Sequence, residues 1–516
     1  MFRICSVFRQ ACETSATRSQ FLAVAAPVNN VPSRSKRSRR RTRGYDAGRA
    51  LLTFRQSVER APDPLAFPKL APQQVTKILN LNESRKEVDT SHPCAVKRYD
   101  INKIPSNDPI EDRDVHGQLS ISKHSSPYLF GVYDGHAGSA CSQTLCDRLF
   151  QYIAVSLSPY EILEKITSQR IRVEDIVTMY ENQYSTEHIP DHLASIYKKS
   201  VLKYAKEMLA SYEHHLVSDH LISAFTRLDQ DMLEEGLPST EGFSIDSLES
   251  TLSGSCACIA MVDNTELYVA NTGDCRAILG VQGLDEEWHH VELSHVHDLQ
   301  NPQEVRRILQ SHPNESTNII KQGRLFGELA PSRAFGDARY KWTLSEMKCF
   351  KDYLSQPNAE LGINPERVMP NNYITPPYLT AEPEVMKHTL TPNDKFLVIA
   401  TDGLWDMLSP EQVVKLVAGH MLGQQVMIPE DLNYGNIGTL KEINKYLKQR
   451  KVGFSNRTVD DNAATHLLRN AFGPEHGRIS AFLSLPESMS RLYRDDTTVI
   501  VVFFDSEFIK NTSKMV

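Results

Sequence analysis

Three aspartates stand where apolar, strand-length runs of the sequence begin or end. Asp134 follows the run 128–133, Asp402 follows 396–401, and Asp495 lies just before 497–504. Carboxylates are the ligands that hard cations such as Mg²⁺ and Mn²⁺ prefer. If the last strand runs antiparallel to its partners, all three acids meet at one edge of a sheet. The pattern therefore predicts a site for divalent cations.

Two such cations, held roughly 4 Å apart, can neutralise the oxygens of a phosphate ester and acidify a bound water molecule. This chemistry suits phosphomonoester hydrolysis, which is among the slowest uncatalysed reactions in water. The plainer interpretation is that Asp134-Gly135 and Asp402-Gly403 are ordinary turn dipeptides. Taken singly, each dipeptide favours that interpretation, whereas three acids in the same setting favour a metal site.

The elements that must position these acids can be read from hydrophobic spacing. We expect strands at 128–133, 256–262, 266–271, 276–280, 396–401 and 497–504, and helices at 72–80, 139–157, 214–235, 302–311 and 410–421. Strands and helices do not alternate regularly, which disfavours a doubly wound parallel sheet. The fold class predicted is α+β, with antiparallel sheets covered by helices.

Composition excludes several classes of protein. The chain has 516 residues, 40% of them hydrophobic, but no run approaches the roughly 20 apolar residues of a membrane span. Its nine cysteines include no Cys-x-x-Cys pair, so neither a zinc–thiolate site nor a disulfide framework is expected. The net charge is −7. An acidic body offers no general attraction for nucleic acid.

The first 60 residues differ in charge from the rest. They hold 12 Arg and one Lys against three acids, a net charge of +10, which leaves −17 for residues 61–516. Residues 1–30 are rich in Arg, Ser and Ala, which is typical of a mitochondrial transit peptide. The basic run 33–43 keeps two alternatives open, a nuclear localisation signal and a solvated tail.

The sequence divides into four segments. Residues 1–60 form the basic leader, and the proline-rich residues 61–110 are expected to be an extended approach segment. Residues 111–508 are expected to form the catalytic domain, with insertions near 158–215, 340–380 and 423–460. A short tail, 509–516, completes the chain.

Five ordered motifs carry a family resemblance. They are GVYDGHAG at 131–138, NTGDCRA at 271–277, SRAFGD at 332–337, ATDGLWD at 400–406 and RDDTT at 494–498. This set resembles the metal-dependent protein phosphatases of type 2C (the PPM family). The resemblance implies a four-layer α-β-β-α sandwich with two Mg²⁺ or Mn²⁺ ions at one end, and serine/threonine protein phosphatase activity.

Three further stretches are similar to one branch of this family, the pyruvate dehydrogenase phosphatases: PIEDR at 109–113, ACSQ at 140–143 and TPPYLTAEPE at 375–384. The similarity runs from about residue 68 to 508. It implies a mitochondrial matrix enzyme that acts on phosphoserine of the pyruvate dehydrogenase E1 alpha subunit. It also implies docking on lipoyl domains of the E2 core, with a regulatory subunit as a further partner. A type 2C phosphatase with another client, and an inactive phosphoprotein-binding scaffold, remain as alternatives.

The resemblance also assigns roles to residues. Asp134 would bridge both metals, the Gly135 carbonyl would bind one of them, and Asp402 and Asp495 would bind the other. Glu111 and Asp112 would hold metal-bound waters. A hydroxide bridging the metals would be the nucleophile, and His136 would protonate the departing serine oxygen. The alternative for His136 is a structural turn histidine.

Other motif members are expected to support loops. They are Asp274, Arg276, Arg333, Asp337 and Asp406. Where the wider family has a phosphate-binding arginine, four residues before the first-motif glutamate, this chain has Asn107. We therefore expect a weaker or differently built hold on the substrate phosphate. The loop 295–298, His-Val-His-Asp, resembles a family loop with one altered residue more than a metal site.

Overall fold

The structure is a computed structural model. It describes residues 69–512 and 514, apart from 89–93, 123–124, 181–188, 214, 239–243, 357–362, 425–457 and 474. The predicted leader at 1–60 and most of the predicted insertion at 423–460 lie outside the described residues.

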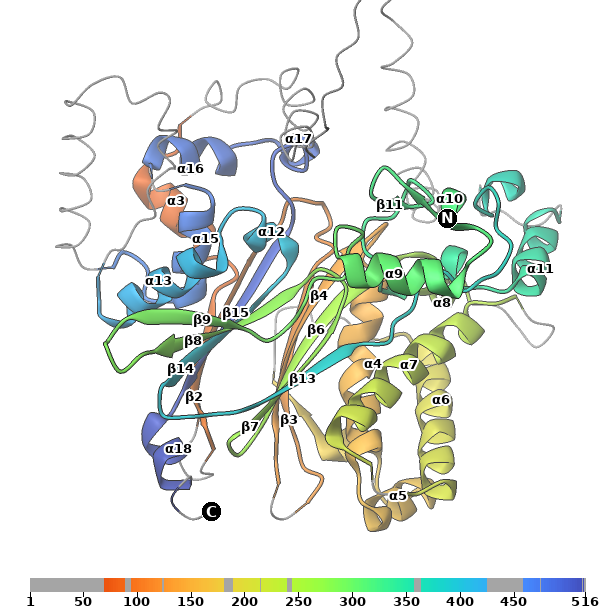
Figure 1. Ribbon diagram of the computed structural model, residues 1–516, viewed down its shortest axis with the longest axis horizontal. Helices are drawn as coiled ribbons and strands as arrows, with labels where there is room; N and C mark the ends of the chain where they lie inside the picture. The colour runs from red at the N-terminus through yellow and green to blue at the C-terminus, as the bar shows by residue number, and fades with distance from the viewer. Residues whose placement is uncertain are drawn as a thin grey trace, which may run out of the picture.

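Two antiparallel sheets form the centre of the molecule (Figure 1). The first has the order β1 (Ser84–Glu87), β2 (Val96–Ile104), β15 (Thr497–Phe504), β14 (Asp394–Ala400), β8 (Arg276–Gln282) and β9 (Trp288–Glu292). The second has the order β13 (Glu384–Thr389), β7 (Glu266–Thr272), β6 (Gly254–Asp263), β4 (Tyr128–His136), β3 (Arg113–Leu119) and β5 (Val177–Met179), with β12 (Phe335–Gly336) paired to β6.

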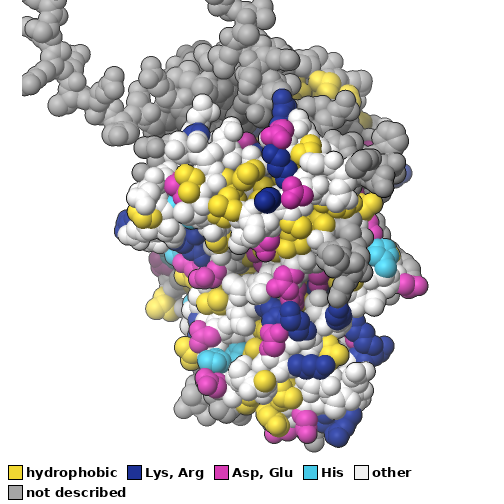
Figure 2. Space-filling model, turned by 90° about the vertical axis from the view of Figure 1, so that its right-hand side faces the viewer, with side chains coloured by type: hydrophobic (Ala, Val, Ile, Leu, Met, Phe, Trp, Pro, Cys, Tyr) yellow, Lys and Arg dark blue, Asp and Glu magenta, His cyan; other side chains and the backbone are white. Residues whose placement is uncertain are grey.

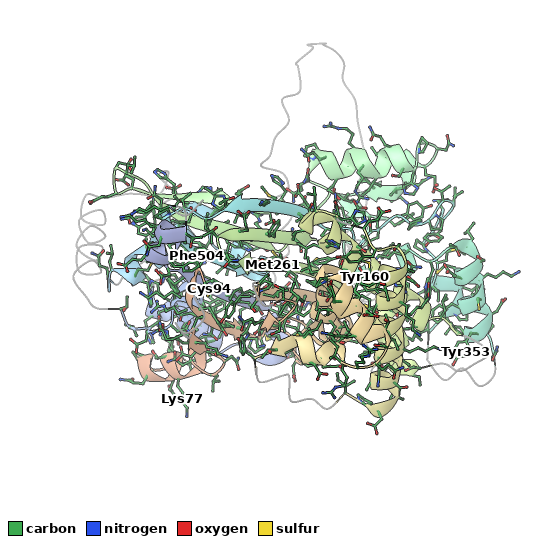
Figure 3. The ribbon with its side chains drawn as sticks, turned by 90° about the horizontal axis from the view of Figure 1, so that it is seen from below. Lys77, Cys94, Tyr160, Met261, Tyr353 and Phe504 are labelled. Atoms are coloured by element: carbon green, nitrogen blue, oxygen red, sulfur yellow. The ribbon has the colours of Figure 1, made fainter. Side chains whose placement is uncertain are left out.

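Helices cover the outer face of each sheet, so the molecule has four layers. The second sheet packs against α4 (Ala140–Leu157), α5 (Tyr160–Thr167), α6 (Asp191–Ala210) and α7 (Val217–Glu235) through one apolar cluster. The first packs against α3 (Pro72–Leu79), α13 (Pro410–Met421), α15 (Ala463–Ala471) and α16 (His476–Leu483). A third cluster fills the space between the sheets. Figure 3 shows Lys77 of α3 and Tyr160 of α5 on opposite sides of these sheets. This α+β sandwich confirms the predicted fold class.

A smaller lobe adjoins the open end of the sandwich. It contains α8 (Ile245–Leu252), α9 (Pro302–Ser311), α10 (Ser316–Ile319), β10 (Ile320–Lys321), β11 (Arg324–Leu325), η3 (Ala338–Tyr340), α11 (Leu344–Leu354) and η4 (Pro365–Arg367), and it has its own apolar cluster. On the face shown in Figure 2, hydrophobic side chains gather in the upper part and Lys and Arg in the lower part. The remaining elements are η2 (Val173–Ile176), α12 (Asp402–Trp405), α17 (Glu487–Ser490) and α18 (Ser506–Thr512).

Most predicted elements have nearly the expected bounds. α9, α13 and β15 match residue for residue, and α13 begins as its sequence indicates, with a Ser409 side chain that accepts from the Gln412 backbone N–H and Pro410 in the first turn. One boundary was wrong. β4 continues to His136 because residues 134–136 pair with 254–256 of β6. Asp134 therefore lies within a strand and does not follow it.

The segment 61–110 differs from the expected extended approach. The helix expected at 72–80 is present as α3, but the segment also contains the strands β1 and β2, and β2 lies inside the first sheet, hydrogen-bonded to β15. β2 carries charged and polar residues among its apolar ones, and its polar side is covered by protein, so no apolar run marks it as a central strand. Asn102, for example, is fully buried and its Nδ2 donates to Leu79 O at 2.8 Å. Likewise α18 extends past residue 508, and its Ile509 is buried.

Two of the predicted insertions are structured. Residues 158–215 contribute α5, η2, β5 and α6, and β5 pairs with β3. Residues 340–380 contribute α11 and η4 to the smaller lobe. Five of the seven described cysteines are buried, and all seven are free thiols. None of the described helices is long and apolar enough to cross a membrane.

Candidate active site

Three aspartates from different elements converge at the end of the sandwich beside α12 (Figure 1). Asp134 comes from β4, Asp402 begins α12 immediately after β14, and Asp274 lies in the turn between β7 and β8. One carboxylate oxygen from each lies within 4.8 Å of the others. Each side chain is partly exposed, so a cation can reach it from solvent. Asp274 was expected only to support a loop, and its place in this group is the main surprise of the site.

Asp495 lies just before β15 and outside this group of three. β15, which it precedes, is antiparallel to β14, with Ala400 opposite Val499, so the condition for the three acids to share an edge is met. Asp495 is not one of the three converging acids, yet its charge helps to raise the pKa of both Asp134 and Asp402. We call these four acids, together with Glu111 and Asp112, the acid cluster.

The acid cluster lacks sufficient positive charge of its own. Burial, and then the neighbouring carboxylates, raise the pKa values of Asp134, Asp402 and Asp112 well above their ordinary range. Like charges packed this closely oppose ionisation unless cations compensate them. The donors are all carboxylate oxygens, which suit Mg²⁺ or Mn²⁺ and not a soft metal. The residues present therefore fit a divalent-cation site.

Glu111 and Asp112 tie this cluster to the loop before β3. Asp112 is buried, and its Oδ2 accepts from the hydroxyls of Thr401 and Thr498, both at 2.8 Å. Glu111 Oε1 accepts from the Gly138 backbone N–H at 2.6 Å. These contacts fix both acids beside the strand ends that carry the other carboxylates.

Asp496 holds the same loop in place, although no role was predicted for it beyond its position next to Asp495. Its buried carboxylate accepts from the backbone N–H groups of Ser106 at 2.5 Å, Asn107 at 2.8 Å and Glu111 at 2.7 Å. The Asn107 side-chain amide donates to it as well, at 2.9 Å. A single carboxylate thus holds the chain on both sides of the turn that presents Glu111 and Asp112.

Gly135 lies where backbone segments approach closely. A Cβ there would stand 2.4 Å from Glu111 O and 2.8 Å from Ser142 Oγ. Any side chain would push the first-motif loop away from β4. The need for glycine therefore has a steric cause, independent of any role for its carbonyl.

His136, at the end of β4, pairs with Asp337. The His136 Nε2 lies 2.6 Å from Asp337 Oδ2. Burial lowers the pKa of His136, but the Asp337 carboxylate outweighs it and the pKa is raised above its usual value. Gly254 makes room for the pair, since a Cβ there would stand 2.1 Å from Nε2. The ion pair with Asp337 therefore favours the protonated form of His136, which lies near the carboxylates of Glu111 and Asp274.

Asn107, predicted near the substrate phosphate, lies at the edge of the acid cluster. Besides its contacts with Asp496, its Oδ1 accepts from Arg491 Nη1 at 2.8 Å. Arg491 Nη1 also donates to Glu111 Oε2 at 3.1 Å. An arginine that follows α17 therefore lies next to Asn107, at the position where the wider family has a phosphate-binding arginine.

Two neighbouring loops are supported by ion pairs. Glu304 of α9 accepts from Arg333 at 2.7 Å and from Arg307 at 2.9 Å, and these contacts fix the loop before β12. In the loop 295–298, His295 lies 2.9 Å and His297 3.6 Å from Glu384. Among the described residues, the only metal-capable group of three or more His, Cys, Asp or Glu is the Asp134, Asp274 and Asp402 group.

Comparisons with known proteins agree with this geometry. Residues 181–434 match the model of the family "Protein phosphatase 2C". Pyruvate dehydrogenase (acetyl-transferring) phosphatase 1, mitochondrial, from Bos taurus is 40% identical over 457 residues, which cover 85% of this chain and 84% of the relative. The chain belongs to the protein phosphatase 2C family. It is a metal-dependent serine/threonine protein phosphatase.

Two human relatives have similar coverage. Pyruvate dehydrogenase phosphatase 1 is 39% identical and covers 85% of this chain, and phosphatase 2 is 39% identical and covers 86%; the chain spans 84% of each. Both are named as mitochondrial. The alignments with these relatives, over 457 and 471 residues, are longer than the family match to residues 181–434, which contains neither Asp134 nor Asp495. The family assignment therefore rests on 85–86% of the chain.

Proposed function

We propose that the chain removes phosphate from phosphoserine on the E1 alpha subunit of pyruvate dehydrogenase, with two Mg²⁺ or Mn²⁺ ions in the acid cluster. The convergence of Asp134, Asp274 and Asp402 within 4.8 Å supports the metal-dependent chemistry. The choice of client is supported by relatives that are named as pyruvate dehydrogenase phosphatases.

Within this proposal, Asp134 would contact both cations and the Gly135 carbonyl one of them. Asp402 and Asp495 would bind the other, while Glu111 and Asp112 would hold bound waters in place. Asp274 lies close enough to Asp134 and Asp402 to join them as a direct or water-mediated ligand. When bound, the cations supply Lewis acidity at the phosphate oxygens and a nucleophile made from water.

His136 would supply the proton for the leaving group. As the bond between phosphorus and the serine oxygen breaks, that oxygen takes the proton from the imidazolium. Asp337, 2.6 Å from Nε2, keeps the ring charged and fixes its orientation. The alternative role, a purely structural histidine, predicts no dependence on the leaving group.

The client can be tested by comparing two substrates. Purified pyruvate dehydrogenase complex, phosphorylated by its kinase, and a generic phosphoserine peptide would be incubated with the enzyme and Mn²⁺ or Mg²⁺. The proposal expects release from E1 alpha to be faster by at least tenfold in kcat/KM, and chelation to abolish both reactions. Equal rates would point to another client, whereas no metal-dependent hydrolysis of either substrate would favour a phosphoprotein-binding scaffold.

The proposed partners are the lipoyl domains of the E2 core and a regulatory subunit, and the proposed compartment is the mitochondrial matrix. The exposed lysines of α6 offer one charged surface for docking (Figure 2). Reversal of Lys198 and Lys199 to Glu should weaken retention on immobilised lipoyl domain if α6 takes part. A fluorescent reporter fused to residues 1–60 distinguishes the matrix from the nucleus.

A further inference from the structure

A phosphatase with this acid cluster faces an electrostatic difficulty. Its substrate is a phosphate dianion, and the six acids of the cluster present negative charge at the same end of the sandwich. Bound metal ions would compensate the negative charge of the acids, but the substrate phosphate also needs hydrogen-bond donors for the oxygens that do not contact a metal. A suitable donor would be a positively charged side chain at the edge of the acid cluster. One part of it would be bonded to the protein, and the other would be free to bind phosphate.

Arg491 has this arrangement. It follows α17 on the loop that leads to Asp495, and its side chain is 44% exposed. One nitrogen, Nη1, donates to both Asn107 Oδ1 and Glu111 Oε2. Within the part of the chain that the structure describes, Nε and Nη2 donate to nothing. Those two nitrogens form the edge that binds two oxygens of a phosphate in parallel.

The position of Arg491 places its positive charge next to the acid cluster. Its Nη1 lies 3.1 Å from Glu111 Oε2, and Arg491 is only four residues before Asp495 in the chain. Arg491 therefore lies between an acid of the first-motif loop and an acid of the last strand. A phosphate bound at its open edge would stand beside the acid cluster.

Two other arginines near the site are less suited. Arg494 lies over the ring of Phe472, 5.4 Å from the centroid, and its Nε and Nη1 are buried in the interior. Arg276 lines a separate pocket of about 320 Å³ with residues of the loop 295–301. Neither contacts Glu111 in the described structure.

We propose that Arg491 binds the phosphate of the substrate through its Nε and Nη2 edge, with Asn107 as the positioning residue that holds Nη1. This inference rests on the phosphatase reaction of the family and adds to it a binding residue from a different element. Asn107 alone does not replace an arginine; it holds one that comes from elsewhere in the chain.

The test uses the whole enzyme and inorganic phosphate, a competitive product, as the probe. Arg491→Met, Arg491→Lys and the matched variant Arg276→Met would be assayed on an aryl phosphate for KM, kcat, the inhibition constant of phosphate and the half-activating Mn²⁺ concentration. Arg491→Met should raise both KM and the inhibition constant by about tenfold or more, as expected for loss of a charged hydrogen-bonding pair. Arg491→Lys should retain part of the affinity, because a point charge remains.

The controls separate binding of phosphate from neutralisation of Glu111. Arg276→Met should change the inhibition constant of phosphate by less than about twofold. If Arg491→Met leaves that constant unchanged, or loses activity only through a higher Mn²⁺ requirement, the proposal is wrong. The same holds if Arg276→Met has the larger effect. Should Arg491→Met lose its thermal unfolding transition, Arg491→Gln decides by the same measurements. Hydrolysis by the wild-type enzyme stands whichever result is obtained.

Discussion

The Asp496 carboxylate and the backbone N–H of Glu111 are joined by a 2.7 Å hydrogen bond although 385 residues separate them. The bond belongs to a set of four that Asp496 accepts from residues 106–111. The acid at the start of the last strand thereby sets the position of the first acidic motif. One consequence is that the acid cluster can form only when both ends of the described chain are folded together.

Asp496→Ala should therefore be both unstable and inactive. Four donors would lose their acceptor in a buried place, at a cost of about 3 kcal/mol in the free energy of unfolding. Urea unfolding measures that change, and phosphatase assays at saturating Mn²⁺ measure the loss of function. The matched control is Asp505→Ala, which removes a carboxylate bonded to the backbone N–H groups of Glu507 and Phe508 at the start of α18. It should cost about 1 kcal/mol and leave kcat unchanged. Comparable activity losses in both variants would contradict the specific role of Asp496.

The pairing of His136 with Asp337 predicts a dependence on the leaving group. His136→Ala should slow hydrolysis of a phosphoserine peptide by about 10²-fold or more, whereas an aryl phosphate, whose leaving group needs little protonation, should lose less than about tenfold. Asp337→Asn should show the same bias to a smaller extent, because the imidazole remains but is less firmly held as a cation. Equal losses on the two substrates in either variant would indicate that the residue serves only the fold. Circular dichroism spectra of both variants provide the check on folding.

The presence of Asp274 among the converging acids makes a further prediction. Asp134→Asn should lower Mn²⁺-dependent activity by several orders of magnitude, and Asp274→Asn should raise the half-activating Mn²⁺ concentration by about tenfold. In the presence of chelator both variants should melt at the same temperature as the wild type or higher, since a buried repulsion is relieved. The exposed Asp352→Asn serves as the control. A lower melting temperature for Asp274→Asn with no change in the Mn²⁺ requirement would show that Asp274 supports the loop and does not bind a cation.

The parts of the fold that the sequence predicts well share a physical reason. α9 and α13 begin with side-chain caps, and β15 is an unbroken run of β-branched and aromatic residues, so local rules determine their bounds. β2 was not predicted because its buried face includes Asp100 and Asn102, which hydrogen-bond to residues of α15. No local pattern in the sequence reveals such partners. Likewise β4 extends through Asp134 because it pairs with β6, a tertiary effect.

The candidate site shows the same division. Asp134, Asp402 and Asp495 were found because they adjoin recognisable strands and motifs. Asp274 was named but given a lesser role, since a turn aspartate looks alike whether it supports a loop or faces a cation. Asp496 and Arg491 act on the first-motif loop from the far end of the chain. Sequence spacing carries no information on contacts between residues so far apart.

Stability at low pH offers a test of the loop that carries Asp337. Glu304 is nearly buried, with a side chain 4% exposed, and accepts from Arg333, Arg307 and the Ser332 hydroxyl. Burial opposes its ionisation, but these partners lower the pKa of Glu304 from 4.5 to about 2. A carboxyl whose folded pKa lies below its unfolded value stabilises the protein above the unfolded pKa. That contribution is lost as the pH falls from about 4.5 toward 2.

Glu304→Gln should therefore cost about 2 kcal/mol at pH 7, allowing for solvent screening at its arginine partners. The difference in the free energy of unfolding between variant and wild type should remain constant down to about pH 5 and then narrow as the pH falls to 3.5. It narrows because protonation of Glu304 removes, in the wild type, the ion pairs that the variant lacks at every pH. Urea unfolding at pH 7, 5 and 3.5 measures it. Glu366→Gln, which breaks the exposed pair with Lys351, is the control and should be nearly neutral at each pH. A difference that widens with acidification would mean that Glu304 is not held as a carboxylate by its arginines.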